Sequence, residues 1–273
     1  MGLMLVPTLS PQDHQTLVWA HGQLEHPSFV IRVSNLLGWP LEHAIELLPR
    51  QLHTSVHAVA ETSIKKALHL TVTTLHPRSS HYFVQDRMHR ALCMASGALG
   101  GYFGLPGLLV ELPLSTSLIL RAIADIAQRE GEDLSRLESR MACLEVFAIG
   151  GYSLEDDAAD AGYYGLRLAL GVTVSQATGF IARNGLSREG APVIVRLVTA
   201  LSSRFGLAIS EKGAAQAVPI LGAAGGAVIN LLFMQHFQKM AHAHFTVRRL
   251  ERHYGQQPVR SAYESLSRTE RVF

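Results

Sequence analysis

Apolar residues recur at intervals of three and four along most of this chain, which is the period of an α-helix, whereas β-type alternation is rare. The clearest apolar face lies on a helix predicted over residues 41–75 and comprises Leu52, Val56, Val59, Ala60, Ile64 and Ala67. Further helices are predicted over residues 82–112, 115–130, 135–149, 158–182, 192–205 and 211–254. The pattern predicts an all-α fold, with a multi-helix domain over residues 31–263 and a tail over 264–273. Residues 1–30 are predicted to be a loose lead-in that contains one short helix near residues 16–23.

Local signals mark several helix ends. Gly131 and Gly255 follow predicted helices, where glycine accepts the left-handed backbone of a C-cap. Pro192 suits the first position of a helix, because its missing N–H is not needed there. Ser135 and Glu138 have the spacing of a capping box, which predicts that a helix begins at this serine.

Two uncharged runs, residues 91–110 and 213–238, approach the ~20 apolar residues that cross a bilayer. Both runs contain glycines four positions apart, a spacing that lets helix backbones approach closely in a membrane or in a soluble core. The sequence therefore predicts Gly-rich, closely packed apolar helices. The glycines expected at helix crossings or facing lipid are Gly97, Gly100, Gly101, Gly104, Gly222 and Gly226.

Composition narrows the class of protein. Apolar residues make up 48% of the chain and charged residues 17%, against a usual charged share of about 25%. This chain can bury enough apolar surface to fold. A net charge of +2, without dense Lys/Arg beside aromatics, excludes the usual nucleic-acid surface. Cys93 and Cys143 are expected as buried free thiols, and the N-terminus lacks a secretory pattern, so a cytoplasmic location is expected.

Two polar residues interrupt the apolar runs. Glu111 and Asn230 must find polar partners if they are buried. They are expected either to line a lipid or substrate cavity or to pair structurally.

One helix face carries a weak metal candidate, formed by His53, His57 and Glu61 at steps of four. Two imidazoles and a carboxylate can bind zinc, but no fourth ligand can be named. Lys65, four residues after Glu61, is a competing ion-pair partner. Motifs for nucleotide binding and for the common hydrolases are absent from the sequence, and no cofactor is expected.

A basic segment follows the second uncharged run. Its Lys and Arg residues suit the anionic cytoplasmic leaflet, where each adds about 1 kcal/mol of attraction. The residues predicted to meet the membrane surface are Lys239, Arg248, Arg249 and Arg252.

Three blocks, residues 39–52, 97–133 and 212–255, resemble the EcsC family of bacterial proteins, and the resemblance covers residues 32–263. The most specific part is the Gly-rich run that leads to Glu111, Leu112 and Pro113. The family takes its name from a protein encoded beside an ABC transporter and linked to secretion. The resemblance implies a membrane-associated role, and it supplies no active-site residues.

The resulting expectation is a non-enzymatic accessory protein at the inner face of the cytoplasmic membrane. It would bind lipid or a membrane-protein partner such as an ABC transporter. The alternative is a hydrolase or peptidase, with a metal-dependent mechanism as one form, because some family members carry a peptidase label.

Overall fold

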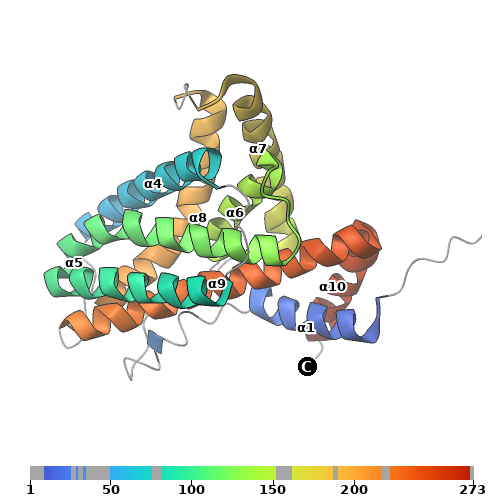
Figure 1. Cartoon of the computed structure of the whole chain (residues 1–273), viewed down its shortest axis with the longest axis horizontal. Coiled ribbons are helices and arrows are strands. Elements are labelled where there is room, and N and C mark those ends of the chain that lie inside the picture. Colours follow the sequence, from blue (N-terminus) through green and yellow to red (C-terminus); the bar gives the residue numbers. More distant parts are fainter. Residues whose placement is uncertain are drawn as a thin grey trace, which may run out of the picture.

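The computed structural model describes residues 9–25, 29, 33–34, 50–75, 82–151, 162–186, 190–216 and 222–270. Regular structure in these ranges is helical, and they contain no strand, which confirms the predicted all-α fold (Figure 1). The helices are α1 (Pro11–Glu25), α4 (Arg50–Thr73), α5 (Tyr82–Arg129), α6 (Leu137–Ile149), α7 (Tyr163–Asn184), α8 (Pro192–Gln216), α9 (Gly222–Tyr254) and α10 (Gln256–Glu270).

Helix α5 doubles back on itself. The side chains of Ser96 and Glu111 lie 3.4 Å apart, although 15 residues of straight helix would separate them by about 22 Å. Figure 1 shows two arms of α5 running side by side and meeting at one end. The two helices predicted over 82–112 and 115–130 are therefore one element, and its reversal falls in the Gly-rich stretch.

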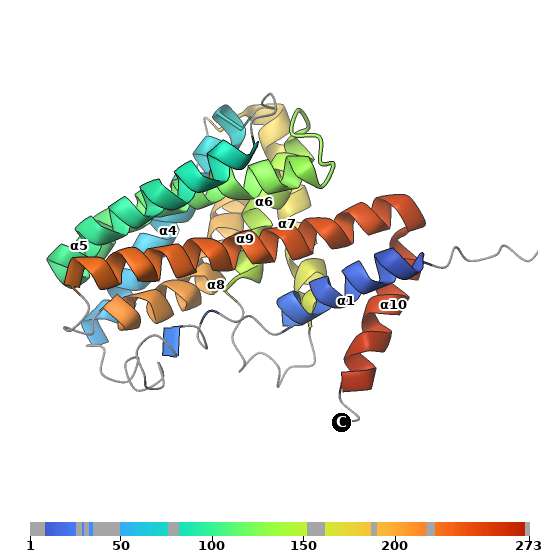
Figure 2. The same ribbon diagram turned by 60° about the horizontal axis from the view of Figure 1, so that its bottom comes forward.

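The second uncharged run is divided between two helices, which corrects the single helix predicted over 211–254. Helix α8 continues from Pro192 to Gln216, and α9 begins at Gly222. The sequence between them contains Pro219, a residue that cannot donate a helical hydrogen bond. Helix α9 then crosses the molecule and packs most extensively against α5 (Figure 2).

One stretch of the described residues, Pro192–Ala215, is long and apolar enough to cross a membrane, but 44% of its most apolar window is buried within the protein. Core helices of soluble proteins satisfy the same criterion. Neither uncharged run predicted from the sequence meets it within the described part of the chain.

The core is centred on aromatic contacts between α6, α8 and α9. The ring of Phe147 lies 4.9 Å from that of Phe205 and 5.4 Å from that of Phe237, and the Phe233 ring is 5.0 Å from Phe237. All four side chains are buried. Tilted and edge-on arrangements of this kind are the favourable geometry for aromatic pairs, so this cluster fixes how the three helices cross.

Within the predicted lead-in, residues 11–25 form α1, which is longer than the helix expected near residues 16–23. Helix α1 begins after Ser10, whose hydroxyl accepts a hydrogen bond from the backbone N–H of Asp13 at 3.1 Å. Leu17, Ala20 and Leu24 bury one face of α1, and the helix lies along the C-terminal part of α9 (Figure 2). Helix α10 likewise extends to Glu270, into the predicted tail.

Several predicted helix ends are confirmed. Gly131 and Gly255 have positive φ angles of 82° and 89°, and Pro192 is the first residue of α8. The predicted capping box is wrong, because α6 begins at Leu137 and its N-cap makes no side-chain hydrogen bond. Ser135 instead donates its hydroxyl to Asp133 at 2.6 Å.

Candidate functional site

The structure brings Glu111 and Asn230 together in the interior. The Asn230 side-chain amide donates to the Glu111 carboxylate at 2.7 Å, and the Lys212 ammonium donates to the other carboxylate oxygen at 2.8 Å. These residues come from α5, α9 and α8, and all three are buried. The cluster ties three helices together by hydrogen bonds to a single carboxylate.

The Asn230 amide also holds the first arm of α5. It donates to the backbone oxygen of Cys93 at 2.7 Å and to the hydroxyl of Ser96 at 3.2 Å. A Cβ atom added at Gly97 would lie 2.5 Å from both the Cβ of Asn230 and the backbone oxygen of Gly226. Glycine at position 97 is therefore what lets the two helices approach closely enough for these hydrogen bonds.

Charge and burial oppose one another at Glu111. Burial alone would raise the pKa of its carboxyl, but the Lys212 charge and the hydrogen bonds from Lys212 and Asn230 outweigh it and lower the pKa below its ordinary value. Burial also raises the pKa of the neighbouring Cys93 thiol to about 12. That thiol is protonated at neutral pH, and protonated thiols are poor nucleophiles.

Sequence reasoning missed Lys212. It ends the charged segment before an uncharged run, which is where a surface charge would also stand. Its side chain is 0% exposed and its nitrogen lies 4.8 Å from the centre of the Phe233 ring. The signal that could have found Lys212 was the presence of Glu111 within an apolar run, because a buried carboxylate is stabilised by a cation nearby.

The other predicted glycines are described only in part. Gly226 is buried and contributes its backbone oxygen to the close approach at Gly97. Gly100, Gly101, Gly104 and Gly222 lie where the structure describes no side-chain surroundings, and their predicted roles remain predictions.

The metal candidate gains no further ligand. Glu61 pairs with Lys65 at 2.6 Å, His57 is exposed, and the side chain of His53 lies outside those the structure describes. Within the described ranges no three His, Cys, Asp or Glu side chains are grouped as metal ligands. The second cysteine, Cys143, is buried, and burial raises the pKa of its thiol.

The basic segment of α9 is engaged within the fold. Arg248 donates to Glu132 at 2.8 and 3.2 Å, and Arg249 donates to Glu130 at 2.9 Å. Arg252 also binds Glu132, while Lys239 is exposed. The three arginines thus pair with Glu130 and Glu132, just beyond the end of α5, and with Asp13 of α1, which lies 3.9 Å from Arg249. The membrane-surface role predicted for this segment stays a prediction.

A second buried polar cluster lies where α6, α7 and α9 meet. The Tyr163 hydroxyl and the His244 ring nitrogen Nδ1 are 2.9 Å apart, and His244 Nε2 lies 4.0 Å from the Glu145 carboxyl. Burial raises the pKa of Glu145 and lowers that of His244 well below its ordinary value, so burial disfavours the charged form of each group. Arg167 lies beside the Tyr163 hydroxyl, at 3.5 Å, and donates two hydrogen bonds to Glu251, at 2.8 and 2.7 Å.

The exposed surface of helices α7 and α8 differs from both buried clusters. The exposed fractions of its aliphatic side chains are large, at 69% for Leu168, 59% for Val172, 49% for Val195 and 40% for Leu207. The described residues between 162 and 210 contain no Asp or Glu, and their charged residues are Arg167, Arg183, Arg196 and Arg204. Glu189 lies in the connection between the helices, outside the described residues.

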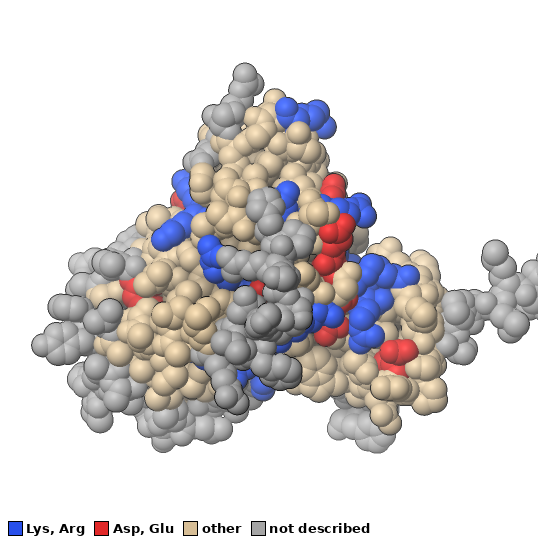
Figure 3. Space-filling model, in the orientation of Figure 1, with Lys and Arg blue, Asp and Glu red and all other residues tan. Residues whose placement is uncertain are grey.

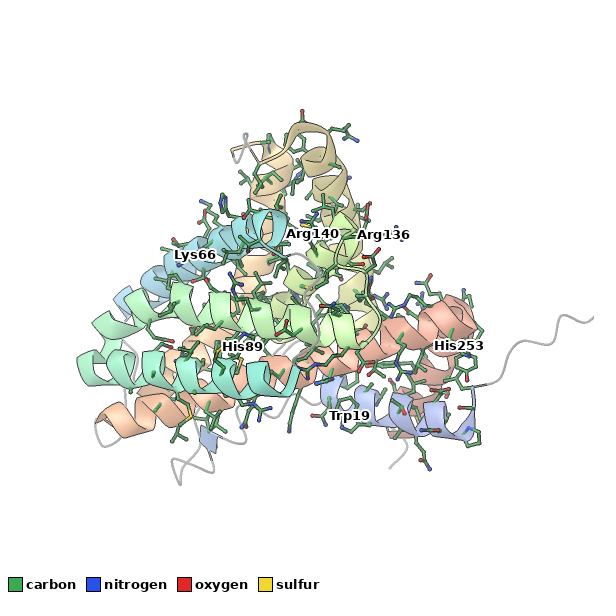
Figure 4. The ribbon with its side chains drawn as sticks, viewed as in Figure 1. Trp19, Lys66, His89, Arg136, Arg140 and His253 are labelled. Atoms are coloured by element: carbon green, nitrogen blue, oxygen red, sulfur yellow. The ribbon has the colours of Figure 1, made fainter. Side chains whose placement is uncertain are left out.

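We call the pair of helices α7 and α8 the α7–α8 hairpin. It projects from the body of the molecule (Figure 1) and its visible face is mainly uncharged, with Lys/Arg at its far end (Figure 3). Arg183 and Arg196 are exposed on it. An exposed aliphatic surface that also carries the exposed charges of Arg183 and Arg196 is suited to an anionic, partly apolar partner.

Comparison with known protein families identifies the family of this chain. The chain matches the model of the EcsC protein family over residues 12–250, from α1 to α9, and it belongs to that family. No curated protein and no solved structure matches the chain. The family membership agrees with the resemblance seen in the sequence.

Proposed function

We propose that this EcsC-family protein is a non-enzymatic accessory protein that associates with the inner face of the cytoplasmic membrane by binding anionic lipid through the α7–α8 hairpin. The observation that carries the proposal is the pairing of exposed aliphatic side chains with arginine, in described residues 162–210 that hold no acid. Aliphatic side chains enter the interfacial region of a leaflet, while arginines contact its anionic head groups.

The proposed lipid contact lies on the α7–α8 hairpin and not on the basic segment of α9 that the sequence favoured. The arginines of α9 already donate to Glu130 and Glu132, and moving them to lipid would leave those acids unpaired. Arg183 and Arg196 are exposed on the hairpin, so their charge can act on a membrane without breaking an ion pair in the core.

Vesicle flotation tests the proposal. The purified protein should float with vesicles of phosphatidylglycerol and phosphatidylcholine, and much less with vesicles of phosphatidylcholine alone. The double variant Arg183→Glu/Arg196→Glu should reduce binding to the anionic vesicles by at least about tenfold, since each basic residue adds about 1 kcal/mol of attraction. Lys66→Glu/Arg136→Glu, which reverses two exposed basic residues outside the hairpin, makes the same change in net charge and should bind as the wild type does.

Two results would overturn the proposal. Equal recovery on neutral and anionic vesicles would remove its electrostatic basis. Failure of a folded sample to float with either kind of vesicle would exclude lipid binding and favour a protein partner for the same surface.

A further inference from the structure

A groove of about 190 Å³ lies between α4 and the region where α7 leads into α8. Its floor is apolar and includes the buried side chains of Leu68, Ile194 and Val198. Its α4 edge carries Glu61, Lys65 and His69, which follow one another at steps of four along the helix. The groove is thus apolar beneath and charged along one side.

This arrangement is suited to an aliphatic chain that ends in an anionic group. The floor is lined by aliphatic side chains, so it favours a hydrocarbon. Lys65 at this edge is paired with Glu61 at 2.6 Å, whereas Arg196, which follows the lining residue Val195, is exposed and available to an anion. An apolar cavity of about 150 Å³ accommodates a benzene molecule, so this groove holds a short part of a chain and leaves the rest outside.

The groove is continuous with the exposed aliphatic surface of the α7–α8 hairpin. Val195 lines the groove and is also 49% exposed on that surface. The next residue, Arg196, is one of the exposed arginines of the hairpin. A hydrocarbon chain from a leaflet in contact with the hairpin therefore reaches the groove across Val195 and meets positive charge on the way.

We propose that this groove binds the part of one acyl chain nearest the head group of an anionic membrane lipid, with the anionic head group near Arg196. The proposal rests on the proposed function, because it needs the hairpin to lie on a membrane. It goes beyond that function by assigning a defined lipid site. Binding of one chain in a groove orients the protein on the leaflet, whereas a general electrostatic attraction does not.

Photocrosslinking tests the groove separately from membrane binding. The probe is phosphatidylglycerol with a diazirine on one acyl chain, incorporated into phosphatidylglycerol–phosphatidylcholine vesicles. Crosslinked peptides are then mapped by mass spectrometry. The expected crosslinks fall on the groove floor, at Leu68, Ile194 and Val198. Flotation of the same samples reports whether the protein is on the membrane at all.

Val195→Trp should fill the mouth of the groove at a partly exposed position, where the fold tolerates a larger side chain. Crosslinking to the floor should fall about tenfold, because overpacking excludes the chain, while flotation changes by less than about twofold since the arginines remain. Val18→Trp is the control, because this residue is 43% exposed on α1 and lies outside both the hairpin and the groove; it should change neither measurement.

The outcomes separate the two proposals. Flotation with crosslinks confined to the outer face of α7, at Leu168 and Val172, would refute the lipid groove and retain the membrane-associated function. Floor crosslinks that Val195→Trp leaves unchanged would also refute it. Absence of flotation would refute the proposed function itself, and with it the groove as a membrane-lipid site.

Discussion

The ammonium nitrogen of Lys212 lies 2.8 Å from a carboxylate oxygen of Glu111, and their side chains are 0% and 4% exposed. The two residues are 101 positions apart in the sequence. Their contact joins the second arm of α5 to α8, and Asn230 of α9 donates to the same carboxylate at 2.7 Å. The donors Lys212 and Asn230 stabilise the fold by compensating the buried charge of Glu111, because a buried charge without partners is strongly destabilising.

Replacement of Lys212 by Met is expected to destabilise the fold by about 3–5 kcal/mol, since it leaves the buried Glu111 charge without its cation. Urea unfolding followed by circular dichroism at neutral pH measures the loss. Glu111→Gln/Lys212→Met should lose less than Lys212→Met alone, because no buried charge remains. Lys239→Met, at an exposed lysine of α9, is the control and should change stability by at most about 0.5 kcal/mol. Equal stability of Lys212→Met and wild type would contradict the buried pair.

Gly97→Ala should destabilise the fold by about 1–3 kcal/mol or more, because its new Cβ would meet the Gly226 backbone oxygen and the Asn230 Cβ at 2.5 Å. Gly171→Ala provides a control of the same chemistry. An added Cβ at Gly171 in α7 has no neighbour within 4 Å, so alanine there should stabilise the helix by roughly 0.5–1 kcal/mol. Thermal unfolding of both variants decides the matter, and a stabilised Gly97→Ala would show that α5 and α9 do not approach closely.

The features of the fold that depend on a few neighbouring residues could be predicted from the sequence. The period of apolar residues identified the helices, and Gly131 and Gly255 marked helix ends, because both signals act within a few residues. The reversal of α5 could not be predicted, since periodicity reports that a segment is helical and not where it turns back. Partners such as Arg248 and Glu132 are 116 residues apart, and no spacing rule connects them.

The candidate sites were likewise predictable only in part from the sequence. Glu111 and Asn230 stood out as polar residues in apolar runs, but Lys212 did not, because a lysine at the end of an uncharged run has the pattern of a surface residue. The exposed aliphatic face of the α7–α8 hairpin was also missed. The sequence shows that a helix is apolar on several faces. Which of those faces is buried and which stays exposed depends on the helices that pack against it in the fold.

Glu145→Gln should stabilise the protein at neutral pH by roughly 1 kcal/mol or more, because burial penalises the charged form of this carboxyl. Burial raises the pKa of Glu145, with Glu132 adding to the rise and Arg248 and Arg167 opposing it. The stability of the protonated form is fully present below the ordinary pKa of 4.5 and is lost as pH rises through the folded-state pKa.

The advantage of Glu145→Gln should therefore vanish below about pH 4 and grow as the pH rises. Denaturation midpoints measured across this range test the sign. The facing group from α9, His244, does not obscure the comparison, because it is present in both proteins. A variant whose advantage is greatest in acid would show that Glu145 is ionised and stabilising in the fold.

The purified protein is expected to carry no stoichiometric zinc. Glu61 is occupied by Lys65 at 2.6 Å, and zinc sites in proteins use three or four ligands held in a fixed geometry. Elemental analysis of protein prepared without a histidine tag measures the metal content. About one zinc per chain, lost in the variant His57→Ala, would contradict this expectation and would revive the metal-dependent hydrolase alternative.

Arg248→Met should destabilise the fold by about 3 kcal/mol, because Glu132 is buried and would lose both hydrogen bonds, at 2.8 and 3.2 Å, that Arg248 donates. Burial alone would raise the pKa of Glu132, but Arg248 and its other donors lower it. The contribution of the pair is therefore present above the ordinary pKa of 4.5 and lost as pH falls through the folded-state value. The difference between Arg248→Met and wild type should accordingly shrink in acid. Arg196→Met should show the reverse, with unchanged unfolding and weaker binding to anionic vesicles. Loss of vesicle binding in a stably folded Arg248→Met would instead place the lipid contact on α9.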